Sequence, residues 1–343
     1  MNQTRIGVIG LGRMGKNHCR VLSTLRTAEL IGVFDIDPEV GLSIAREYQS
    51  SFHNNLESLL LNVDAVIVAT PTHTHFEIVK QALDHGVHVF VEKPLAENVA
   101  TAEQLCEVAA ESPLVVQVGH IERFNPAYRE LKNLLEHMQV LAIDFRRLSP
   151  FQGSNVDVDV VFDLMVHDTD LILNLVGEEP DEVNVYGISA LSDVIDHVVA
   201  LLFYPNGPLV SMTASRVTEE KIRRIEVTTL EAYIEADLLN KSLSANRRTV
   251  GEYLDNNRDG VKYRQESLVE RIHVPGFEPL QLELSHFIDC VQGKGDCLVP
   301  ACDGLSALQM VEQIQQKATE HLITMPMELR SRQTIQERMP THG

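Results

Sequence analysis

The sequence predicts an α/β Rossmann domain, a doubly wound parallel sheet, followed by an α+β domain with a large open, mainly antiparallel sheet. Three observations predict it. Short apolar segments alternate with helical patterns in the first third of the chain, as in parallel α/β sheets. Beyond about Arg123, strand-like segments follow one another with few helices between them. The 343 residues also exceed the roughly 250–300 at which one hydrophobic core stops growing. We therefore expect two domains, residues 1–122 and 123–343.

The first elements form a strand, a tight turn, a helix and a second strand. Residues 5–10 are an apolar run, and a helical pattern of buried-type residues follows them. A second apolar run, residues 30–34, ends at Asp35, and Pro38 suits the first turn of the next helix. The order predicts one βαβ unit.

The rest of the first domain continues the alternation. Three apolar runs rich in β-branched residues are typical of strands covered on both faces. We expect strands at residues 65–69, 87–91 and 114–118, with helices at 76–83 and 100–110.

The second domain begins its regular structure with one clear helix, at residues 163–175. We expect strands at residues 183–189, 197–204, 209–216, 223–229 and 232–236, then helices at 280–290 and 303–318. Without helices between these strands, the sheet should be antiparallel. The polar tail that follows is either mobile or wraps a neighbouring molecule.

The composition excludes several classes of protein. Apolar residues make up 44% and charged residues 23%, as in ordinary globular proteins. Acidic residues exceed basic ones by 49 − 29 = 20, which argues against general nucleic-acid binding. Five cysteines without CxxC spacing indicate reduced thiols in a cytoplasmic protein. The sequence has no signal-peptide form and no apolar run of about 18 residues, so we expect neither secretion nor membrane spanning.

A glycine turn, Gly10-Leu11-Gly12-Arg13-Met14-Gly15, lies between the first strand and the first helix. In this context the first glycine permits the turn, the second lets backbone N–H groups approach a pyrophosphate, and the third allows close helix packing. We therefore predict a dinucleotide site at Gly10, Gly12, Arg13 and Met14.

Two further segments extend this predicted cofactor site. Asp35 ends the second strand, where a carboxylate accepts hydrogen bonds from ribose hydroxyls and repels a 2′-phosphate. This favours NAD, although Arg13 leaves NADP open. Thr70, Pro71 and His75 follow the next strand, on the same edge, and we expect them beside the nicotinamide half. His75 either contacts the cofactor or caps the following helix.

The turn Glu92-Lys93-Pro94 follows the strand at residues 87–91. Open α/β sheets bind ligands outside the carboxyl ends of their strands, so Lys93 should enter the cleft and Glu92 should border the cofactor. An ammonium there polarises a carbonyl, stabilises an alkoxide or transfers a proton. The alternative is a surface lysine before a proline-bounded loop.

Asp163 and His167 begin the clear helix of the second domain and, four residues apart, share one face of it. An imidazole that titrates near neutrality suits proton removal from a sugar hydroxyl, and a carboxylate one turn away orients it. A packed or capping histidine is the alternative.

With these motifs in this order, the chain resembles the Gfo/Idh/MocA family of NAD(P)-dependent sugar and inositol dehydrogenases. The resemblance covers nearly the whole sequence. It implies a Rossmann domain, an α+β domain whose open sheet commonly mediates dimers or tetramers, and a catalytic group formed by Lys93, Asp163 and His167.

A narrower resemblance rests on the segment from Gly119 to Ala127 together with Ala214-Ser215-Arg216. It is similar to a subgroup of the family, the UDP-N-acetylglucosamine 3-dehydrogenases that supply 3-amino sugars for lipid A or other glycans. It implies that His120, Arg123, Asn125 and Arg216 bind substrate, with Lys93, Asp163 and His167. The basic run at residues 221–224 is better explained as a solvated charged hairpin. The sequence shows no metal-ligand spacing, so we predict no metal.

Our hypothesis from the sequence is NAD-dependent oxidation of the C3 hydroxyl of UDP-N-acetylglucosamine by a cytoplasmic homodimer or homotetramer. His167 takes the hydroxyl proton and Lys93 stabilises the developing charge, or the two roles are exchanged. The alternatives are oxidation of myo-inositol or another sugar with NAD(P), and a non-catalytic nucleotide-binding regulator.

Overall fold

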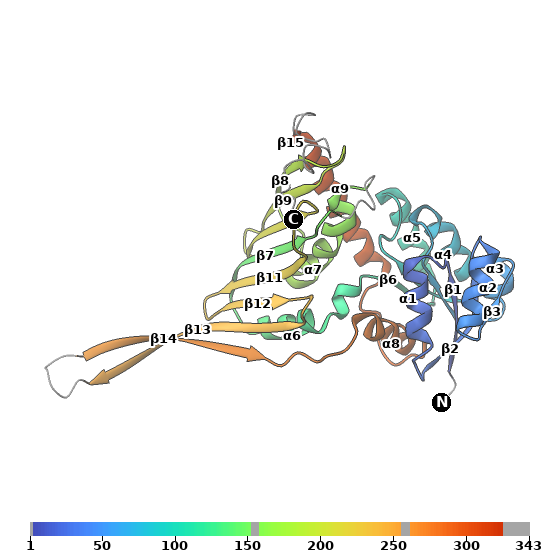
Figure 1. Ribbon diagram of the computed structural model, residues 1–343, viewed down its shortest axis with the longest axis horizontal. Helices are drawn as coiled ribbons and strands as arrows, with labels where there is room; N and C mark the ends of the chain where they lie inside the picture. The colour runs from blue at the N-terminus through green and yellow to red at the C-terminus, as the bar shows by residue number, and fades with distance from the viewer. Residues whose placement is uncertain (1–2, 152–157, 255–260, 325–343) are drawn as a thin grey trace, which may run out of the picture. The chain divides into compact units, whose positions relative to one another are not determined.

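A computed structural model describes residues 3–151, 158–254 and 261–324 (Figure 1). The described residues form two compact units. The first comprises the chain up to Phe124 and the segment Phe277–Glu312, and the second comprises Asn125–Gly276 and the chain from Gln313 onward. The polar tail for which we expected mobility or contact with a neighbour begins after residue 318; its residues 322–324 form a strand, and residues 325–343 lie outside the described residues.

The first unit contains a parallel sheet whose strand order is β3-β2-β1-β4-β5-β6 among the described residues. Its strands are β1 (Thr4–Ile9), β2 (Ala28–Phe34), β3 (Ser51–Phe52), β4 (Ala65–Val68), β5 (His88–Glu92) and β6 (Val116–Gly119). All neighbouring pairs are parallel. This is the doubly wound order in which ligands bind where the strand order reverses, between β1 and β4. The predicted Rossmann fold is confirmed.

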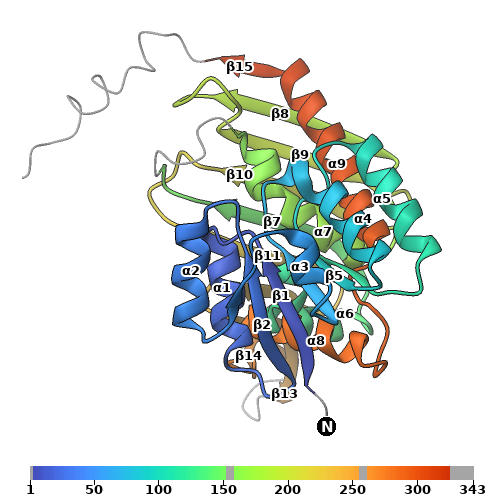
Figure 2. The same cartoon turned by 90° about the vertical axis from the view of Figure 1, so that its right-hand side faces the viewer.

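Helices cover both faces of this sheet (Figure 2). Those of the unit are α1 (Arg13–Leu22), α2 (Pro38–Glu47), α3 (Leu56–Leu60), α4 (His75–Asp84), α5 (Val99–Glu111) and α8 (Pro279–Val291), with 3-10 turns η1 (Thr72–Thr74) and η2 (Ile121–Phe124). Apolar side chains of α1, α2 and α8 share one buried cluster with Ile6, Val8 and Phe90 of the sheet. On the opposite face Leu59 of α3 packs at Gly7 and Gly32, which leave room for it.

Helix α8 differs from the expectation that everything after residue 122 belongs to the second domain. Its buried residues Leu280, Leu284, Phe287 and Ile288 lie in the core cluster of the Rossmann unit. The Gln292 amide at its end donates a hydrogen bond of 2.9 Å to the Thr4 hydroxyl. The apolar face of α8 therefore packs on the first sheet, and residues 277–312 return to the first unit.

The second unit is built on a larger sheet of nine strands within the described part of the chain. In sheet order these are β14 (Val261–Ile272), β13 (Ser242–Leu254), β12 (Tyr233–Asp237), β11 (Ile222–Thr229), β7 (Val140–Leu148), β10 (Leu209–Ser215), β9 (His197–Phe203), β8 (Glu182–Ser189) and β15 (Leu322–Thr324). Only the β7–β10 and β8–β15 pairs among these strands are parallel. The predicted open, mainly antiparallel sheet is confirmed.

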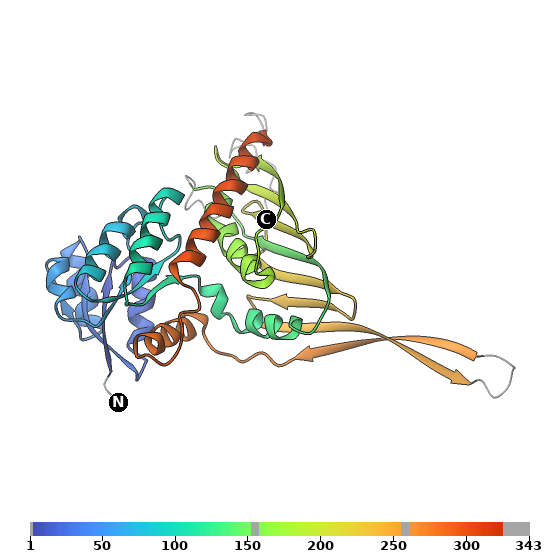
Figure 3. The ribbon, with the colours of Figure 1, turned by 180° about the vertical axis from the view of Figure 1, so that it is seen from behind.

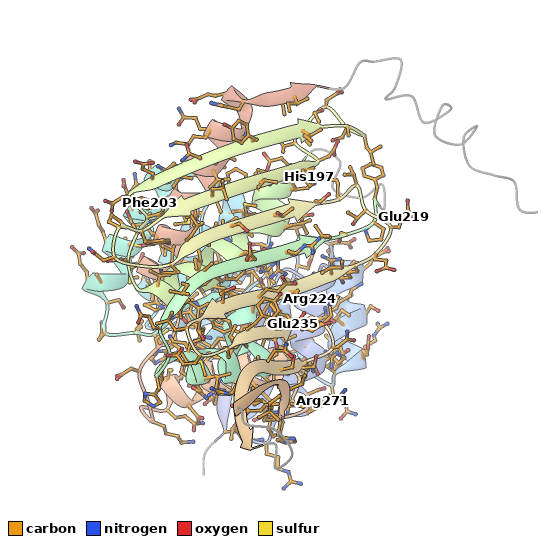
Figure 4. All side chains as sticks on the ribbon, turned by 90° about the vertical axis from the view of Figure 1, so that its left-hand side faces the viewer. His197, Phe203, Glu219, Arg224, Glu235 and Arg271 are labelled. Atoms are coloured by element: carbon orange, nitrogen blue, oxygen red, sulfur yellow. The ribbon has the colours of Figure 1, made fainter. Side chains whose placement is uncertain are left out.

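One face of this sheet is covered by helices and the other is open (Figures 3 and 4). The helices are α6 (Pro126–Leu135), the π-turn η3 (Val161–Met165), α7 (Val166–Val176) and the end of α9 (Ala301–Glu320). Alternate strand residues such as Val185, Leu202, Met212 and Val227 are buried beneath them. Figure 4 views the opposite face, from which His197, Phe203, Arg224 and Glu235 project.

None of the helices in the described residues combines the length and the apolar character needed to cross a membrane.

Candidate active site

The glycine turn links β1 to α1, and two of its glycines are required by their surroundings. Gly10 has a φ of +84°, and a Cβ there would lie 2.8 Å from the Ala69 carbonyl oxygen. A Cβ at Gly15 would lie 1.9 Å from the Gly10 carbonyl oxygen. A side chain at Gly10 would push the turn away from the loop after β4, and one at Gly15 would push α1 away from the turn.

Gly12 has a different role, because a Cβ built there meets no described atom within 4 Å. It is the N-cap of α1, and no side chain caps the helix at this end. The first N–H groups of α1, together with the positive end of its dipole, suit an anionic group such as a pyrophosphate. Arg13 is exposed and Met14 is half-buried at the same helix end. The turn thus fits a dinucleotide.

Asp35 follows β2 directly and is fixed by two backbone groups. Its Oδ2 accepts a hydrogen bond of 2.6 Å from the N–H of Leu11, within the glycine turn. Its Oδ1 accepts one of 2.9 Å from the N–H of Asp37. The half-buried carboxylate is therefore held beside the turn, at the edge where the sequence predicted ribose binding.

The segment after β4 contains Thr70, Pro71 and His75. Thr70 is half-buried and Pro71 is exposed, and the Thr74 hydroxyl lies 2.8 Å from both the Thr70 hydroxyl and the Pro71 carbonyl oxygen. His75 is buried, with Nε2 3.0 Å from the Thr70 carbonyl oxygen and Nδ1 3.1 Å from that of Pro94. Burial lowers the pKa of His75 despite these hydrogen bonds. The ring joins two loops, and its contact with the cofactor stays a prediction.

Lys93 follows the last residue of β5 and is half-buried. The Lys93–Pro94 peptide bond is cis. The Lys93 N–H donates a hydrogen bond of 3.3 Å to Oε2 of Glu92, and Oε1 of Glu92 lies 2.7 Å from Nε2 of His18. Lys93 thus stands at the carboxyl end of the sheet, the edge that also bears the glycine turn.

His18 is a contact of the Glu92-Lys93-Pro94 turn that the sequence analysis did not single out. Its side chain is fully buried on α1 and its ring packs edge-on against Phe90, with centroids 5.3 Å apart. The available signal was a histidine on the apolar face of α1, beside Val21 and Leu22. A polar ring in such a position requires a buried partner.

In the second unit, Asp163 lies within the π-turn η3 and His167 is the second residue of α7. Both are half-buried. Inserted π-turns frequently mark functional positions in helices. The next residue, Asp168, is buried and pairs with Arg147 of β7 through contacts of 2.7 Å and 2.9 Å. This buried pair fixes the start of α7 and hence the backbone that carries His167.

The predicted substrate-binding residues already have protein contacts. Arg123 forms an ion pair of 3.1 Å with Asp303, and His120 is buried after β6. Asn125 caps α6, accepting from the Ala127 N–H at 3.1 Å and donating to the Leu238 carbonyl at 3.0 Å.

Arg216, predicted on the same grounds, is also buried. It lies 3.6 Å from Asp196 and donates to the Val158 carbonyl. The substrate roles of these four residues therefore remain predictions.

The predicted cofactor-binding residues all lie in the first unit, whereas the predicted catalytic residues are divided between the two units. Gly10, Asp35, Thr70 and Lys93 follow β1, β2, β4 and β5, and so share the carboxyl edge of one parallel sheet. Asp163 and His167 belong to the second unit. Within the three described ranges, no three His, Cys, Asp or Glu side chains gather closely enough to hold a metal ion.

Comparison with known proteins adds two family matches. Residues 4–120 match the oxidoreductase family with an NAD-binding Rossmann fold, Gfo/Idh/MocA, and residues 146–235 match the Gfo/Idh/MocA C-terminal domain. The UDP-N-acetylglucosamine 3-dehydrogenase of Acidithiobacillus ferrooxidans is 32% identical over 91% of the chain and 95% of the relative. Its solved structure superposes with a TM-score of 0.84, 31% identity, and coverage of 94% and 99%. The myo-inositol 2-dehydrogenase of Thermotoga maritima is 31% identical over 68% of the chain and 75% of the relative.

Proposed function

Because the chain belongs to the Gfo/Idh/MocA oxidoreductase family and its cofactor is NAD, we propose that it oxidises the C3 hydroxyl of UDP-N-acetylglucosamine. The product is the 3-keto sugar nucleotide. The observation that carries the proposal is Lys93, held directly after β5 on the edge that bears the NAD-binding glycine turn. Similarity over nearly the full length to a UDP-N-acetylglucosamine 3-dehydrogenase supports this substrate.

The proposed chemistry divides proton and charge between two side chains. NAD, when bound at the glycine turn, supplies the acceptor for the hydride that leaves C3. His167 removes the proton from the C3 hydroxyl, and Asp163, four residues before it, orients the imidazole or the hydroxyl. Lys93 stabilises the negative charge that develops on the C3 oxygen. The roles of Lys93 and His167 can be exchanged without altering the overall reaction.

We further propose that His120, Arg123, Asn125 and Arg216 bind the sugar nucleotide. Guanidinium groups bind diphosphates and hydroxyls well, and the chain is otherwise strongly acidic, with a formal charge of −20. The ion pairs of Arg123 with Asp303 and of Arg216 with Asp196 fix the directions of these two side chains.

A second candidate substrate is a polyol such as myo-inositol, because an inositol dehydrogenase is 31% identical over two thirds of the chain. The same lysine and histidine would serve that reaction. A non-catalytic regulator is disfavoured, since Lys93, Asp163 and His167 are all present.

We also propose that the open face of the second sheet binds a second copy of the chain. Cross-strand neighbours on this face form an acidic row, Asp144, Glu226 and Glu235, beside a basic pair, Arg146 and Arg224. If a two-fold axis of a dimer passes between the acidic row and the basic pair, the arginines of one copy lie opposite the carboxylates of the other. Exposed apolar side chains extend the face across β8, β9 and β10, namely Tyr186, Leu201, Phe203 and Leu209.

The proposed product would feed a reaction that makes 3-amino sugars for lipid A or another glycan. A cytoplasmic location is part of the proposal, because all five cysteines are free thiols, as expected in a reducing compartment.

The catalytic assignment is tested by Lys93→Met and His167→Ala. Each should lower kcat by roughly 10²–10⁴-fold, the usual contribution of positioned acid–base groups. Lys80→Met, on the exposed surface of α4, is the matched control and should leave kcat unchanged. Near-normal turnover by either site variant would exclude that residue from the chemistry.

A further inference from the structure

Two buried histidines contact the residues on either side of Lys93. His18, on α1, meets Glu92, and His75, at the start of α4, meets Pro94. All five residues belong to the first unit. We call Glu92-Lys93-Pro94 the catalytic turn. The two contacts join it to α1, the helix that follows the glycine turn, and to the loop that follows β4.

The first contact connects α1 to the backbone of Lys93 through the carboxylate of Glu92. Nε2 of His18 lies 2.7 Å from Oε1 of Glu92, and Oε2 of the same carboxylate accepts from the Lys93 N–H at 3.3 Å. Gly119 on β6 leaves room for Glu92, since a Cβ there would lie 3.1 Å from Oε2. His18 is fully buried, and its ring is held against Phe90, which packs on Phe287 at 5.7 Å. The Glu92 carboxylate is therefore confined on several sides.

The second contact places the His75 ring between two backbone carbonyl groups. His75 is 1% exposed, and its two ring nitrogens lie 3.1 Å from the Pro94 carbonyl oxygen and 3.0 Å from the Thr70 carbonyl oxygen. Only N–H groups can bond to carbonyl oxygens, and a neutral imidazole carries one such group. Burial lowers the pKa of His75, so the ring donates to one of the two carbonyl oxygens at a time, and it packs between the turn after β5 and the loop after β4 in either tautomer.

We propose that His18 and His75 are positioning residues that brace the catalytic turn and fix Lys93 relative to the NAD-binding edge. The inference rests on the proposed catalytic role of Lys93. A group that acts on a developing charge must be held closely to its productive position, and supporting hydrogen bonds supply that precision. Loss of either brace should lower kcat more than it weakens NAD binding.

The test at His18 compares His18→Leu with His18→Gln in the full-length enzyme. The glutamine amide places a donor near the position of Nε2 and can still bond to Glu92, whereas leucine cannot. We expect His18→Leu to lower kcat by roughly tenfold or more, with the Kd for NAD changed less than about threefold, and His18→Gln to recover most of kcat. Equal losses in the two variants, or a Kd that rises as much as kcat falls, would overturn the proposal.

The test at His75 separates its two carbonyl contacts, with Pro94 and with Thr70. The amide of His75→Asn lies near Nδ1 and retains the bond to Pro94, whereas that of His75→Gln lies near Nε2 and retains the bond to Thr70. If the contact with Pro94 positions Lys93, His75→Asn should have a higher kcat than His75→Gln. A higher kcat for the glutamine variant would show that the loop after β4, and not the catalytic turn, depends on His75.

Hydrogen exchange of the NAD-bound protein distinguishes failure of the brace from failure of the proposed function. His18→Leu should speed exchange of the Lys93 amide, whose acceptor is Glu92, while the amides of α1 remain protected. This result is expected whichever substrate the enzyme uses. Unchanged exchange at Lys93 would reject the brace, whereas a wild-type enzyme inactive with every substrate would reject only the proposed function.

Discussion

At the scale of single residues, the three glycines of the first turn have separable physical roles. Gly10 and Gly15 are required by the fold, since a Cβ at either would approach backbone atoms within 2.8 Å or 1.9 Å. At position 12, neither a steric contact within the protein nor a positive φ requires a glycine. Its missing side chain leaves space at the helix terminus, where we propose that the cofactor's anionic group binds.

This difference predicts opposite effects of two alanine substitutions. Gly15→Ala should destabilise the first unit and lower Tm, because overpacking typically costs about 1–3 kcal/mol and this contact is with backbone. Gly12→Ala should leave Tm nearly unchanged but raise the Kd for NAD by roughly tenfold or more, by blocking the approach of the pyrophosphate. Thermal unfolding and NAD titration measure the two effects. A Gly12→Ala variant with normal NAD affinity would refute the role given to this glycine.

His88 provides a prediction on pH. Burial lowers the pKa of His88 below 6.5, while Asp64 opposes this, and its Nδ1 accepts a hydrogen bond of 2.9 Å from the Val115 N–H. Because the folded-state pKa is the lower one, the unfolded chain binds more protons below about pH 6.5. Stability should therefore fall as pH decreases from 6.5 through the folded-state pKa.

The variant His88→Asn isolates this contribution. Its amide oxygen can accept from the Val115 N–H, but the side chain does not titrate. Urea unfolding at about pH 7.5 and about pH 5.5 should show a smaller loss of stability for His88→Asn than for the wild type. An equal loss in both proteins would mean that His88 does not contribute to the pH dependence.

Sequence patterns predicted those site residues that local position determines. A glycine turn after a strand, Asp35 after the second strand and Lys93 after β5 all follow from the rule that ligands bind at carboxyl ends of strands. His75 was predicted from its position after β4, but its contact with Pro94 and the contact of His18 with Glu92 were not, because these partners are distant in sequence. No local pattern tells which buried ring meets which strand end.

At the scale of elements, α7 depends on the buried pair of Arg147 and Asp168. The two side chains are 2% and 3% exposed, and both nitrogen contacts lie within hydrogen-bond distance. Arg147→Met removes the cation and keeps much of the volume. We expect it to lower the free energy of unfolding by about 3–5 kcal/mol, since breaking a buried pair leaves a buried charge.

The double variant Arg147→Met with Asp168→Leu tests this explanation. It removes both charges, so urea unfolding should show it to be more stable than Arg147→Met alone. If the double variant were the less stable of the two, the loss would come from packing rather than from the buried carboxylate.

The sequence patterns did not predict strands β7, β13, β14 and β15, and each omission has a physical cause. In β7 the buried Arg147 interrupts the alternation of apolar and polar residues that indicates a half-buried strand. Strands β13 and β14 pair with each other along their whole length and are rich in polar residues, which masks them in a hydrophobicity pattern. Strand β15 has three residues and is defined by its partner β8, far away in the sequence.

At the scale of the whole molecule, the proposed pairing through the open sheet face makes a prediction on assembly. Arg224→Glu adds a carboxylate beside Asp144, Glu226, Glu235 and Asp237, so like charges should oppose each other between copies. Light scattering after size exclusion should show a smaller assembly than for the wild type. Glu219→Lys, a charge change outside the strands of this face, is the control and should leave the assembly intact.

A charge exchange completes this test. The double variant Arg224→Glu with Glu226→Arg keeps both signs on the face and should restore much of the association. Wild-type protein that is monomeric at every concentration would exclude the interface altogether.

The first unit is formed by two separate segments of the chain, the second of which is Phe277–Glu312 and includes α8. Sequence periodicity predicted the apolar face of α8 but not the sheet on which it packs, because amphipathicity reports burial and not the partner. Its side chains complete the core around Phe90 in the first unit.

We propose that this oxidoreductase uses NAD to oxidise a UDP-linked amino sugar. The most direct measurement is NADH absorbance at equal concentrations of UDP-N-acetylglucosamine, free N-acetylglucosamine and myo-inositol, each with NAD and with NADP. We predict NADH formation that requires the UDP group and prefers NAD. Turnover of myo-inositol without turnover of UDP-N-acetylglucosamine would contradict the claim.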